Sequence, residues 1–293
     1  MKPFAYACPT SLGEALELLA GSHGRARLMA GGTDLLVKLR LGAIETDRVI
    51  DVKRIRETTG IAFDSRHGLT IGAAVSCAEL CERGEVRRRY PALVDAASLI
   101  GGTAIQARAS LGGNLCNAAP SADGAPALIV LGARCLIAGP RGRRWLPVED
   151  FCVAPGRTAL DRGEMLVALR VPPPVPRSGG AYLRFIPRGE MDIAVAGAAA
   201  WLVLERGCIV RARIALAAVA PRPLPVPEAC AALVGRSPGR EAFGEAARIA
   251  MEAASPVSDV RGTESQRRHL VGVLVRKALA LAAERANAGT AGR

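Results

Sequence analysis

Two pairs of adjacent glycines are the residues of this sequence best suited to holding a ligand. One pair lies in AGGTD, residues 30–34, and the other in SLGGN, residues 110–114. Glycine permits positive φ and close approach of the backbone, so successive N–H groups can converge on an anion. Two such loops from separate parts of one domain could hold a diphosphate from both sides. Taken alone, however, each pair is more often only a tight turn.

Neither loop matches a common nucleotide-binding motif, because GxGxxG and GxxxxGK followed by Ser or Thr are both absent. Features next to the glycines strengthen the ligand interpretation until it is as well supported as a simple turn. The first loop has the polar neighbours Thr33 and Asp34, the second has Ser110 and Asn114, and each is followed by an expected helix start.

The cysteines and histidines do not form a metal-binding or nucleophilic pattern. The eight cysteines contain no CxxC, and the three histidines have neither HxxxH nor HExxH spacing. We therefore expect no metal on this chain and reduced, mostly buried thiols. Cys116, beside the second loop, is interpreted as a structural thiol, because no histidine partner is indicated. No catalytic residue is predicted.

The formal net charge of +12 first suggests nucleic-acid binding. Aromatic residues make up only 3% of the chain, however, so few side chains could stack on bases, and the short arginine clusters alternate with acidic residues. The charge fits a basic face for an acidic protein partner or an anionic cofactor better, and we expect no nucleic-acid partner.

The length of 293 residues, half of them hydrophobic, allows two domains with a substantial core. The longest apolar run, IAVAGAAAWLVL, has twelve residues, which is short of the roughly 20 needed to cross a bilayer. The N-terminus lacks the long apolar stretch of a signal peptide, so we expect no transmembrane segment and a cytoplasmic protein.

The elements that would position the loops follow from hydrophobic periodicity and capping signals. Residues 12–21 form an amphipathic helix that begins with a Ser11/Glu14 capping box. A strand over 25–30, a helix over 34–41 and a strand over 48–53 give a β-α-β order with the first glycine pair at the strand-to-helix turn. A second short helix follows the other loop at about residues 123–131.

The segment VPPPVPRSGG, residues 171–180, divides the chain, because its prolines and glycines cannot continue a helix or a central strand. Three strands follow, over 181–187, 193–205 and 208–220, and then helices. The last helix is expected to start at Thr263 with Gln266 in a capping box. Its predicted apolar face consists of Leu270, Val273, Leu274, Ala278 and Leu281.

With these motifs, the chain resembles the medium, FAD-binding subunit of the molybdenum hydroxylases, a family that includes carbon monoxide dehydrogenase, xanthine dehydrogenase and 4-hydroxybenzoyl-CoA reductase. The resemblance spans nearly the whole chain in the family's order. It is carried by MKPFAYACPTSLGEALELL, LMAGGTDLL, QARASLGGNLCNAAPSADGAPAL, GEMLVALRVP, RGEMDIAVAGAAAWL, ARIALAAVAP and VRGTESQRRHLVGVLVRKAL.

The resemblance implies an α+β fold in two parts. The first is a two-subdomain PCMH-type FAD-binding domain, similar to vanillyl-alcohol-oxidase-like flavoproteins, over residues 1–175, with subdomains of about 1–55 and 56–175. The second, over 176–293, is a CO-dehydrogenase-flavoprotein-like C-terminal domain of antiparallel strands and helices.

The resemblance also implies which residues bind FAD. The first loop would wrap the diphosphate with Leu28, Met29, Ala30, Gly31, Gly32, Thr33, Asp34 and Leu35, and the second would supply Ser110, Leu111, Gly112, Gly113 and Asn114. Asp123 would contact the cofactor as a hydrogen-bond acceptor, and Ile100 and Leu166 would pack on the flavin. Arg184 stands where relatives often have a lysine near the flavin, and its other interpretation is a surface strand residue.

In that family, FAD receives electrons from two [2Fe-2S] clusters on a small subunit. A large subunit carries the molybdenum cofactor, and FAD passes the electrons to an external acceptor. The resemblance therefore implies an oxidoreductase subunit, within a dimer of heterotrimers, with molybdenum and iron–sulfur on its partners and substrate specificity on another polypeptide. The extra iron–sulfur centre of some reductase members is not expected, because no inserted cysteine cluster is present. The alternatives are an autonomous FAD-dependent oxidoreductase and a non-catalytic scaffold of the same fold.

Overall fold

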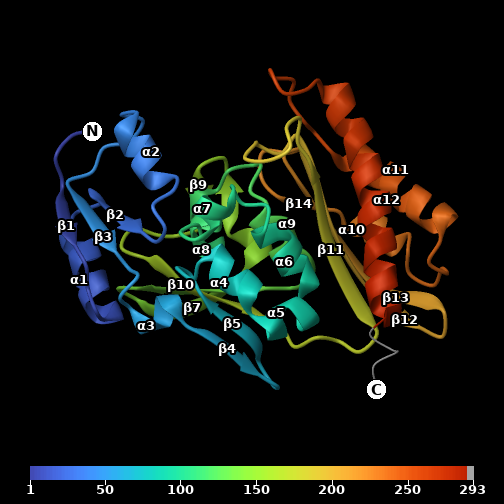
Figure 1. Cartoon of the computed structure of the whole chain (residues 1–293), viewed down its shortest axis with the longest axis horizontal. Helices are drawn as coiled ribbons and strands as arrows, with labels where there is room; N and C mark the ends of the chain where they lie inside the picture. The colour runs from blue at the N-terminus through green and yellow to red at the C-terminus, as the bar shows by residue number, and fades with distance from the viewer. Residues whose placement is uncertain (289–293) are drawn as a thin grey trace.

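The computed structural model describes residues 1–288, so the last five residues of the predicted C-terminal domain lie outside the described part. Three sheets of three or more strands follow one another along the described part of the molecule, from β1–β3 at one end to α11 and α12 at the other (Figure 1). Among residues 1–288, no helix combines the length and the apolar character that a bilayer crossing requires.

The N-terminal unit is a three-stranded parallel sheet in the order β1–β3–β2. Its elements are β1 (Ala5–Ala7), α1 (Leu12–Gly21), β2 (Ala26–Met29), α2 (Leu35–Arg40) and β3 (Arg48–Asp51). The predicted β-α-β order is confirmed, and so is the cap of α1: Ser11 Oγ accepts a hydrogen bond from the Glu14 N–H (3.2 Å).

The middle unit is a five-stranded antiparallel sheet in the order β4–β5–β10–β6–β7. Its strands are β4 (Ile61–Asp64), β5 (Gly68–Gly72), β6 (Arg134–Gly139), β7 (Gly142–Pro147) and β10 (Met165–Val171). Its helices are α3 (Arg56–Thr59), α4 (Cys77–Glu82), α5 (Gly84–Arg89), α6 (Pro91–Ala97), α7 (Thr103–Gln106), α8 (Leu111–Asn117) and α9 (Gly124–Val130). The 3-10 turn η1 (Val148–Asp150) and the hairpin of β8 (Cys152–Ala154) and β9 (Arg157–Thr158) complete this unit.

Both faces of this sheet are buried, and a register shift between Leu166 and Ala168 interrupts the alternation of side chains along β10. Leu166 and Leu169 belong to the core beneath the helices of the middle unit. Met165 and Val167 belong instead to the core shared with α1 and the N-terminal sheet.

The C-terminal unit is a four-stranded antiparallel sheet in the order β11–β12–β13–β14, covered by helices. Its strands are β11 (Ser178–Phe185), β12 (Ala196–Glu205), β13 (Cys208–Ala217) and β14 (Leu224–Pro225), and its helices are α10 (Pro227–Ala231), α11 (Arg240–Ala253) and α12 (Glu264–Ala288). Figure 1 shows β11 between α6 of the middle unit and α12, so this sheet is sandwiched between helices of two units.

Two expectations for this unit were wrong in detail. Gly179 and Gly180 lie inside β11, opposite Leu202 and Trp201, rather than in the break. A Cβ on Gly179 would lie 2.0 Å from the Ala282 carbonyl oxygen, so α12 packs directly on the strand backbone there. The strand therefore uses glycine for close approach and not as a terminator.

The predicted apolar face of α12 was also partly wrong. Leu274 and Ala278 are buried, but Leu270, Val273 and Leu281 are only half-buried. The fully buried stripe is centred on Val271, Val275 and Leu279, because α12 contacts both the sheet and α11 and buries a wider face than one stripe. The predicted cap is confirmed, since Thr263 Oγ1 accepts from the Gln266 N–H (3.1 Å).

All eight cysteines are free thiols, but "mostly buried" was wrong. Cys77, Cys135 and Cys152 are buried, Cys116 is exposed, and the other four are half-buried. Within residues 1–288, no group of three or more potential metal ligands comes together.

Candidate cofactor site between two glycine loops

The structure brings the two glycine loops together although they lie far apart in the sequence. A Cβ added to Gly31 would lie 1.9 Å from the carbonyl oxygen of Arg108 and 3.0 Å from the nitrogen of Ala109. Only glycine fits there, because the first loop rests directly on the backbone that leads into the second. Gly32 has φ +75°, a conformation that also favours glycine.

The first loop presents a row of free hydrogen-bond donors. Within residues 1–288, the backbone N–H groups of Gly31, Gly32, Thr33 and Asp34 donate to no protein acceptor. The next turn is closed, since the Leu36 N–H donates to the Gly32 carbonyl oxygen (2.9 Å). Successive unpaired N–H groups in such a turn form a concave anion-binding surface.

The remaining residues of the first loop frame this turn. Leu28 and Met29 end β2, and Leu35 begins α2. Thr33 is half-buried and Asp34 is exposed, with no side-chain cap onto α2. Their side chains are therefore positioned at the mouth of the turn and not in the core.

A partly buried ion pair between Lys53 and Asp51 supports the first loop. Lys53 Nζ donates to the Ala30 carbonyl oxygen (2.8 Å) and to both oxygens of Asp51 (2.7 Å each). Tyr6 Oη donates to Asp51 Oδ2 (2.7 Å). Burial acts to raise the pKa of Asp51, but the hydrogen bonds from Lys53 and Tyr6 outweigh burial and leave that pKa below its ordinary value. Sequence reasoning missed these three residues, although Asp51 and Lys53 directly follow a predicted strand.

A second contact joins the helices that follow the two loops. Lys38 Nζ in α2 donates to Asn117 Oδ1 at the end of α8 (2.5 Å). These residues are 79 positions apart, and nothing in the sequence pairs them. The contact holds the two loops in a fixed relation.

The second loop uses most of its side chains internally. Ser110 Oγ accepts from the Gly113 N–H (3.0 Å) and caps α8, and Leu111 is in the core. A Cβ on Gly112 would lie 2.3 Å from the Ala73 carbonyl oxygen, and Asn114 Oδ1 accepts from the Gly124 N–H (3.0 Å). At Gly113 an added Cβ would lie 3.1 Å from Ser110 Oγ, a tight contact, and within residues 1–288 no other atom outside the helix backbone lies within 4 Å of it.

Asp123 lies in a buried network that sequence reasoning found only in part. Its Oδ1 accepts from Tyr182 Oη (2.7 Å) and its Oδ2 from Arg184 Nη1 (2.6 Å). Burial raises the pKa of Asp123 above its ordinary value, while Arg184 and Tyr182 act against that rise. Burial and the adjacent carboxylate raise the pKa of Tyr182 well above its ordinary value.

The alternative interpretation of Arg184 as a surface residue is wrong, because its side chain is only 6% exposed. Its Nε is buried and has no partner within residues 1–288. A buried guanidinium N–H without an acceptor is costly, so this atom is suited to an acceptor on a bound group.

Ile100 and Leu166 both pack on the core beneath the middle helices. Ile100 is half-buried, beside the Gly101–Gly102 turn. Leu166 is only 5% exposed, so it offers a bound ring little surface.

The residues present fit FAD at these loops. Within residues 1–288, four free N–H groups belong to the turn where the two loops meet, and a diphosphate needs such donors, while the buried Arg184 Nε lacks an acceptor. A cavity of about 570 Å³ lies elsewhere, beside the C-terminal sheet, and its lining includes none of the predicted cofactor residues.

Two protein-family models match the chain. One, described as the FAD binding domain in molybdopterin dehydrogenase, matches residues 2–174, and one described as the CO dehydrogenase flavoprotein C-terminal domain matches residues 181–282.

Similar proteins carry related descriptions. The chain is 32% identical over 276 residues to the xanthine dehydrogenase FAD-binding subunit of Escherichia coli O157:H7, covering 94% of each chain. It is 32% identical to the carbon monoxide dehydrogenase medium chain of Hydrogenophaga pseudoflava, covering 94% of this chain and 96% of that one. A solved structure of carbon monoxide dehydrogenase from Hydrogenophaga pseudoflava superposes with a TM-score of 0.93 at 33% identity, covering 97% of this chain and 99% of the other.

Proposed function

Since this chain belongs to the FAD-binding medium subunits of the molybdenum hydroxylases, such as carbon monoxide and xanthine dehydrogenase, we propose that it transfers electrons through FAD between partner subunits and an external acceptor. The chain is an oxidoreductase subunit that binds FAD, and molybdenum and iron–sulfur groups belong to other subunits of such complexes.

The meeting of the two glycine loops carries the proposed position of the cofactor. The unpaired N–H groups of residues 31–34 bind the FAD diphosphate, because they form the row of free donors at the loop junction. The first turn of α8 lies on the other side of the junction, where Leu111 and Gly112 begin the helix and Gly113 leaves space for the ligand. The other predicted residues of both loops shape this turn.

The flavin end of the cofactor lies toward Asp123 and Arg184. Arg184 Nε supplies a donor, and Asp123 holds the guanidinium in place through its 2.6 Å contact. Asp123 is 6% exposed and both of its oxygens have protein partners, so it orients Arg184 as well as accepting from the cofactor. Ile100 provides apolar contact with the ring, and Leu166 supports it from the core.

When bound, FAD supplies the redox chemistry, which joins one-electron donors to a two-electron acceptor. The chain itself binds, orients and shields the cofactor. The proposed partners are a small [2Fe-2S] subunit and a large molybdenum-cofactor subunit, arranged as a dimer of heterotrimers, in the cytoplasm. The relatives' names, medium chain and FAD-binding subunit, support such an assembly.

The proposed domain division places residues 1–175 in the FAD-binding domain, with subdomains of about 1–55 and 56–175, and residues 176–293 in the C-terminal domain. The ranges of the two family matches, 2–174 and 181–282, support this division. The first subdomain corresponds to the parallel sheet that carries the first loop.

Gly113→Leu tests the cofactor position, with Gly244→Leu as the matched control. Both glycines are helical, and a Cβ at Gly244 meets nothing within 4 Å. The purified wild-type chain should be yellow and release FAD on denaturation. Gly113→Leu should lose most of its FAD with its fold intact, as measured by flavin fluorescence and circular dichroism, while Gly244→Leu should retain it. A folded but colourless wild-type protein without FAD affinity, or equal FAD content in both variants, would contradict the proposal.

Purification from the native source tests the electron-transfer role. Partners that contain molybdenum and iron–sulfur should co-purify, and the complex should reduce its FAD when it is given substrate. A chain that purifies alone and oxidises a small molecule by itself would indicate an autonomous oxidoreductase instead.

A further inference from the structure

A cavity of about 570 Å³ lies where the proline-rich connection between β10 and β11 crosses the C-terminal sheet. Its walls come from the end of α9, the connection, strands β12 and β13, and the segment around α10. Small-molecule sites commonly have volumes of roughly 300–1,000 Å³ and occur between domains. The cavity therefore has the size and position of a ligand site separate from the glycine loops.

The sheet register explains why the cavity forms at this place. Trp201 on β12 is paired with Arg213 on β13, and Val203 with Arg211, so Trp201, Arg211 and Arg213 lie on the same face of the sheet. Further along this face, Ala199 and Ala215 are small and belong to the core beneath the middle helices. The sheet thus packs closely on the middle unit at the alanines, and the cavity opens where tryptophan and arginine replace them.

The charged side chains that line the cavity are all arginines, namely Arg89, Arg211 and Arg213. None of the eighteen described lining residues is acidic. Arg213 Nη2 is engaged, since it donates to Glu149 Oε2 (2.9 Å). Arg211 is exposed, and within residues 1–288 no carboxylate pairs with it. Its Cζ lies 5.5 Å from the ring centroid of Trp201.

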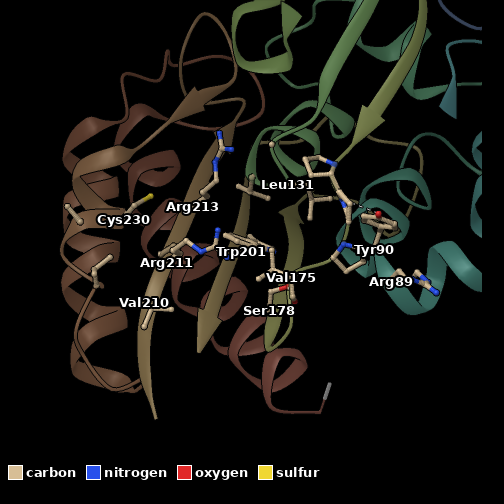
Figure 2. Close-up of a pocket in the computed structure, with 18 residues that line it drawn as sticks. Arg89, Tyr90, Leu131, Val175, Ser178, Trp201, Val210, Arg211, Arg213 and Cys230 are labelled. Atoms are coloured by element: carbon tan, nitrogen blue, oxygen red, sulfur yellow. Dashed lines mark hydrogen bonds between the residues drawn. The ribbon is translucent and has the colours of Figure 1, made fainter. Parts of the chain in front are cut away.

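Figure 2 shows Arg211 beside Trp201 near the middle of the cavity, with Leu131 above the tryptophan and Val175 and Ser178 below it. A guanidinium that lies over an aromatic face keeps its in-plane N–H groups free for a carboxylate or phosphate. Next to these donors, Leu131, Val175 and the prolines Pro172–Pro174 give an apolar wall. A charged group and a flat apolar body can therefore be bound side by side.

We propose that this cavity binds a small anion that carries a flat apolar ring. Arg211 pairs with the carboxylate or phosphate, and Trp201 contacts the ring together with the apolar wall. Aromatic carboxylates and nucleotides share this chemistry. The lining of the cavity begins at Val130, the last residue of the seven-residue helix α9, while Asp123 directly precedes that helix. The nearest part of the cavity wall is thus about 10 Å from Asp123 along the helix axis, outside the proposed cofactor site.

Isothermal titration of the full chain with its FAD bound tests this site with 2-naphthoate and AMP as probes. Bound FAD prevents AMP from occupying the cofactor site. At least one probe should bind, and the uncharged 2-naphthamide and inorganic phosphate should each bind at least about tenfold more weakly, because each lacks one of the two required groups. Binding of neither probe at millimolar concentration, or equal binding of probe and both comparison compounds, would overturn the proposal.

Arg211→Gln tests the residue, with Arg143→Gln as the matched control. Arg143 is also an exposed strand arginine, on β7, and it is not among the lining residues. Arg211→Gln should weaken probe binding at least about tenfold without changing FAD content, and Arg143→Gln should leave it unchanged. Equal affinities in the two variants would overturn the role of Arg211. Measuring FAD in the same samples separates this result from a failure of the proposed cofactor site.

Discussion

Removing one buried hydroxyl should destabilise the chain measurably. Tyr182 is 1% exposed, and its Oη donates to Asp123 Oδ1 at 2.7 Å. Tyr182→Phe keeps the ring but takes one of two partners from a buried carboxylate. A hydrogen bond to a charged group contributes about 1.5–3 kcal/mol. At about 2–4 °C per kcal/mol for a chain of this size class, the melting temperature should fall by about 3–12 °C.

Tyr6→Phe is the matched control for this prediction. Tyr6 also donates to an aspartate at 2.7 Å, Asp51 Oδ2, but Tyr6 is 59% exposed. Water can replace its hydroxyl, and Lys53 still neutralises Asp51. Thermal unfolding of both variants, followed by circular dichroism, should show a clear loss only for Tyr182→Phe. A Tyr182→Phe protein as stable as wild type, or equal losses in both variants, would refute the reasoning from burial.

Three further predictions concern ion pairs. The hydrogen bond from Arg144 lowers the pKa of Glu164, so this carboxylate stabilises the fold above its unfolded pKa of about 4.3, and the contribution is lost as pH falls below that value. In Glu164→Gln the free energy of unfolding should therefore fall less steeply with acid than in wild type, and an unchanged pH profile would contradict this. Arg267→Met should lower the free energy of unfolding in urea by about 3 kcal/mol, because the buried guanidinium donates to the Val195 (2.7 Å) and Ala218 (3.2 Å) carbonyl oxygens. Loss of the exposed helix pair between Arg268 and Glu264 should lower it by under about 0.5 kcal/mol. Equal losses would refute the role of burial. Lys53→Met should raise the dissociation constant for FAD several-fold, because it removes the hydrogen bond to the Ala30 carbonyl oxygen. The control Lys2→Met, which removes only an exposed ion pair, should leave this constant unchanged. Equal FAD affinities in the two variants would show that Lys53 does not position the first loop.

Local signals were enough to predict the elements that flank the first loop. Capping at Ser11 and the glycine pair after an apolar strand act within a few residues, so they can be read directly from the sequence. The three long strands after the proline-rich segment were also predicted, because long apolar runs followed by short turns leave few alternatives.

The five-stranded sheet was not predicted, since its pairing is not local. β10 lies between β5 and β6 and pairs with Thr70 and Arg134 through the same residue, Arg170. Six helices, α4 to α9, separate β5 from β6 along the chain, and β10 comes later still. Hydrophobic periodicity alone therefore cannot indicate which strands are neighbours. The same limit explains the error in α12, where the buried face depends on two packing partners that the sequence does not identify.

The proposed cofactor site shows most clearly why residue types alone were not sufficient. Asp123 and Arg184 were both predicted to lie near the cofactor, but as separate contacts, and they are in fact each other's partners across 61 positions. Tyr182, the third member, is on β11, and its backbone N–H donates to Asp95 Oδ2 (3.1 Å), the carboxylate that also pairs with Arg285 of α12 (2.6 Å). The C-terminal unit therefore fixes strand β11, whose Tyr182 and Arg184 donate hydrogen bonds to Asp123. A chain cut at residue 175 would keep both glycine loops yet lose Tyr182 and Arg184, and its Asp123 would be a carboxylate without either partner. The C-terminal domain therefore supplies two side chains of the proposed cofactor site, in addition to stabilising the fold.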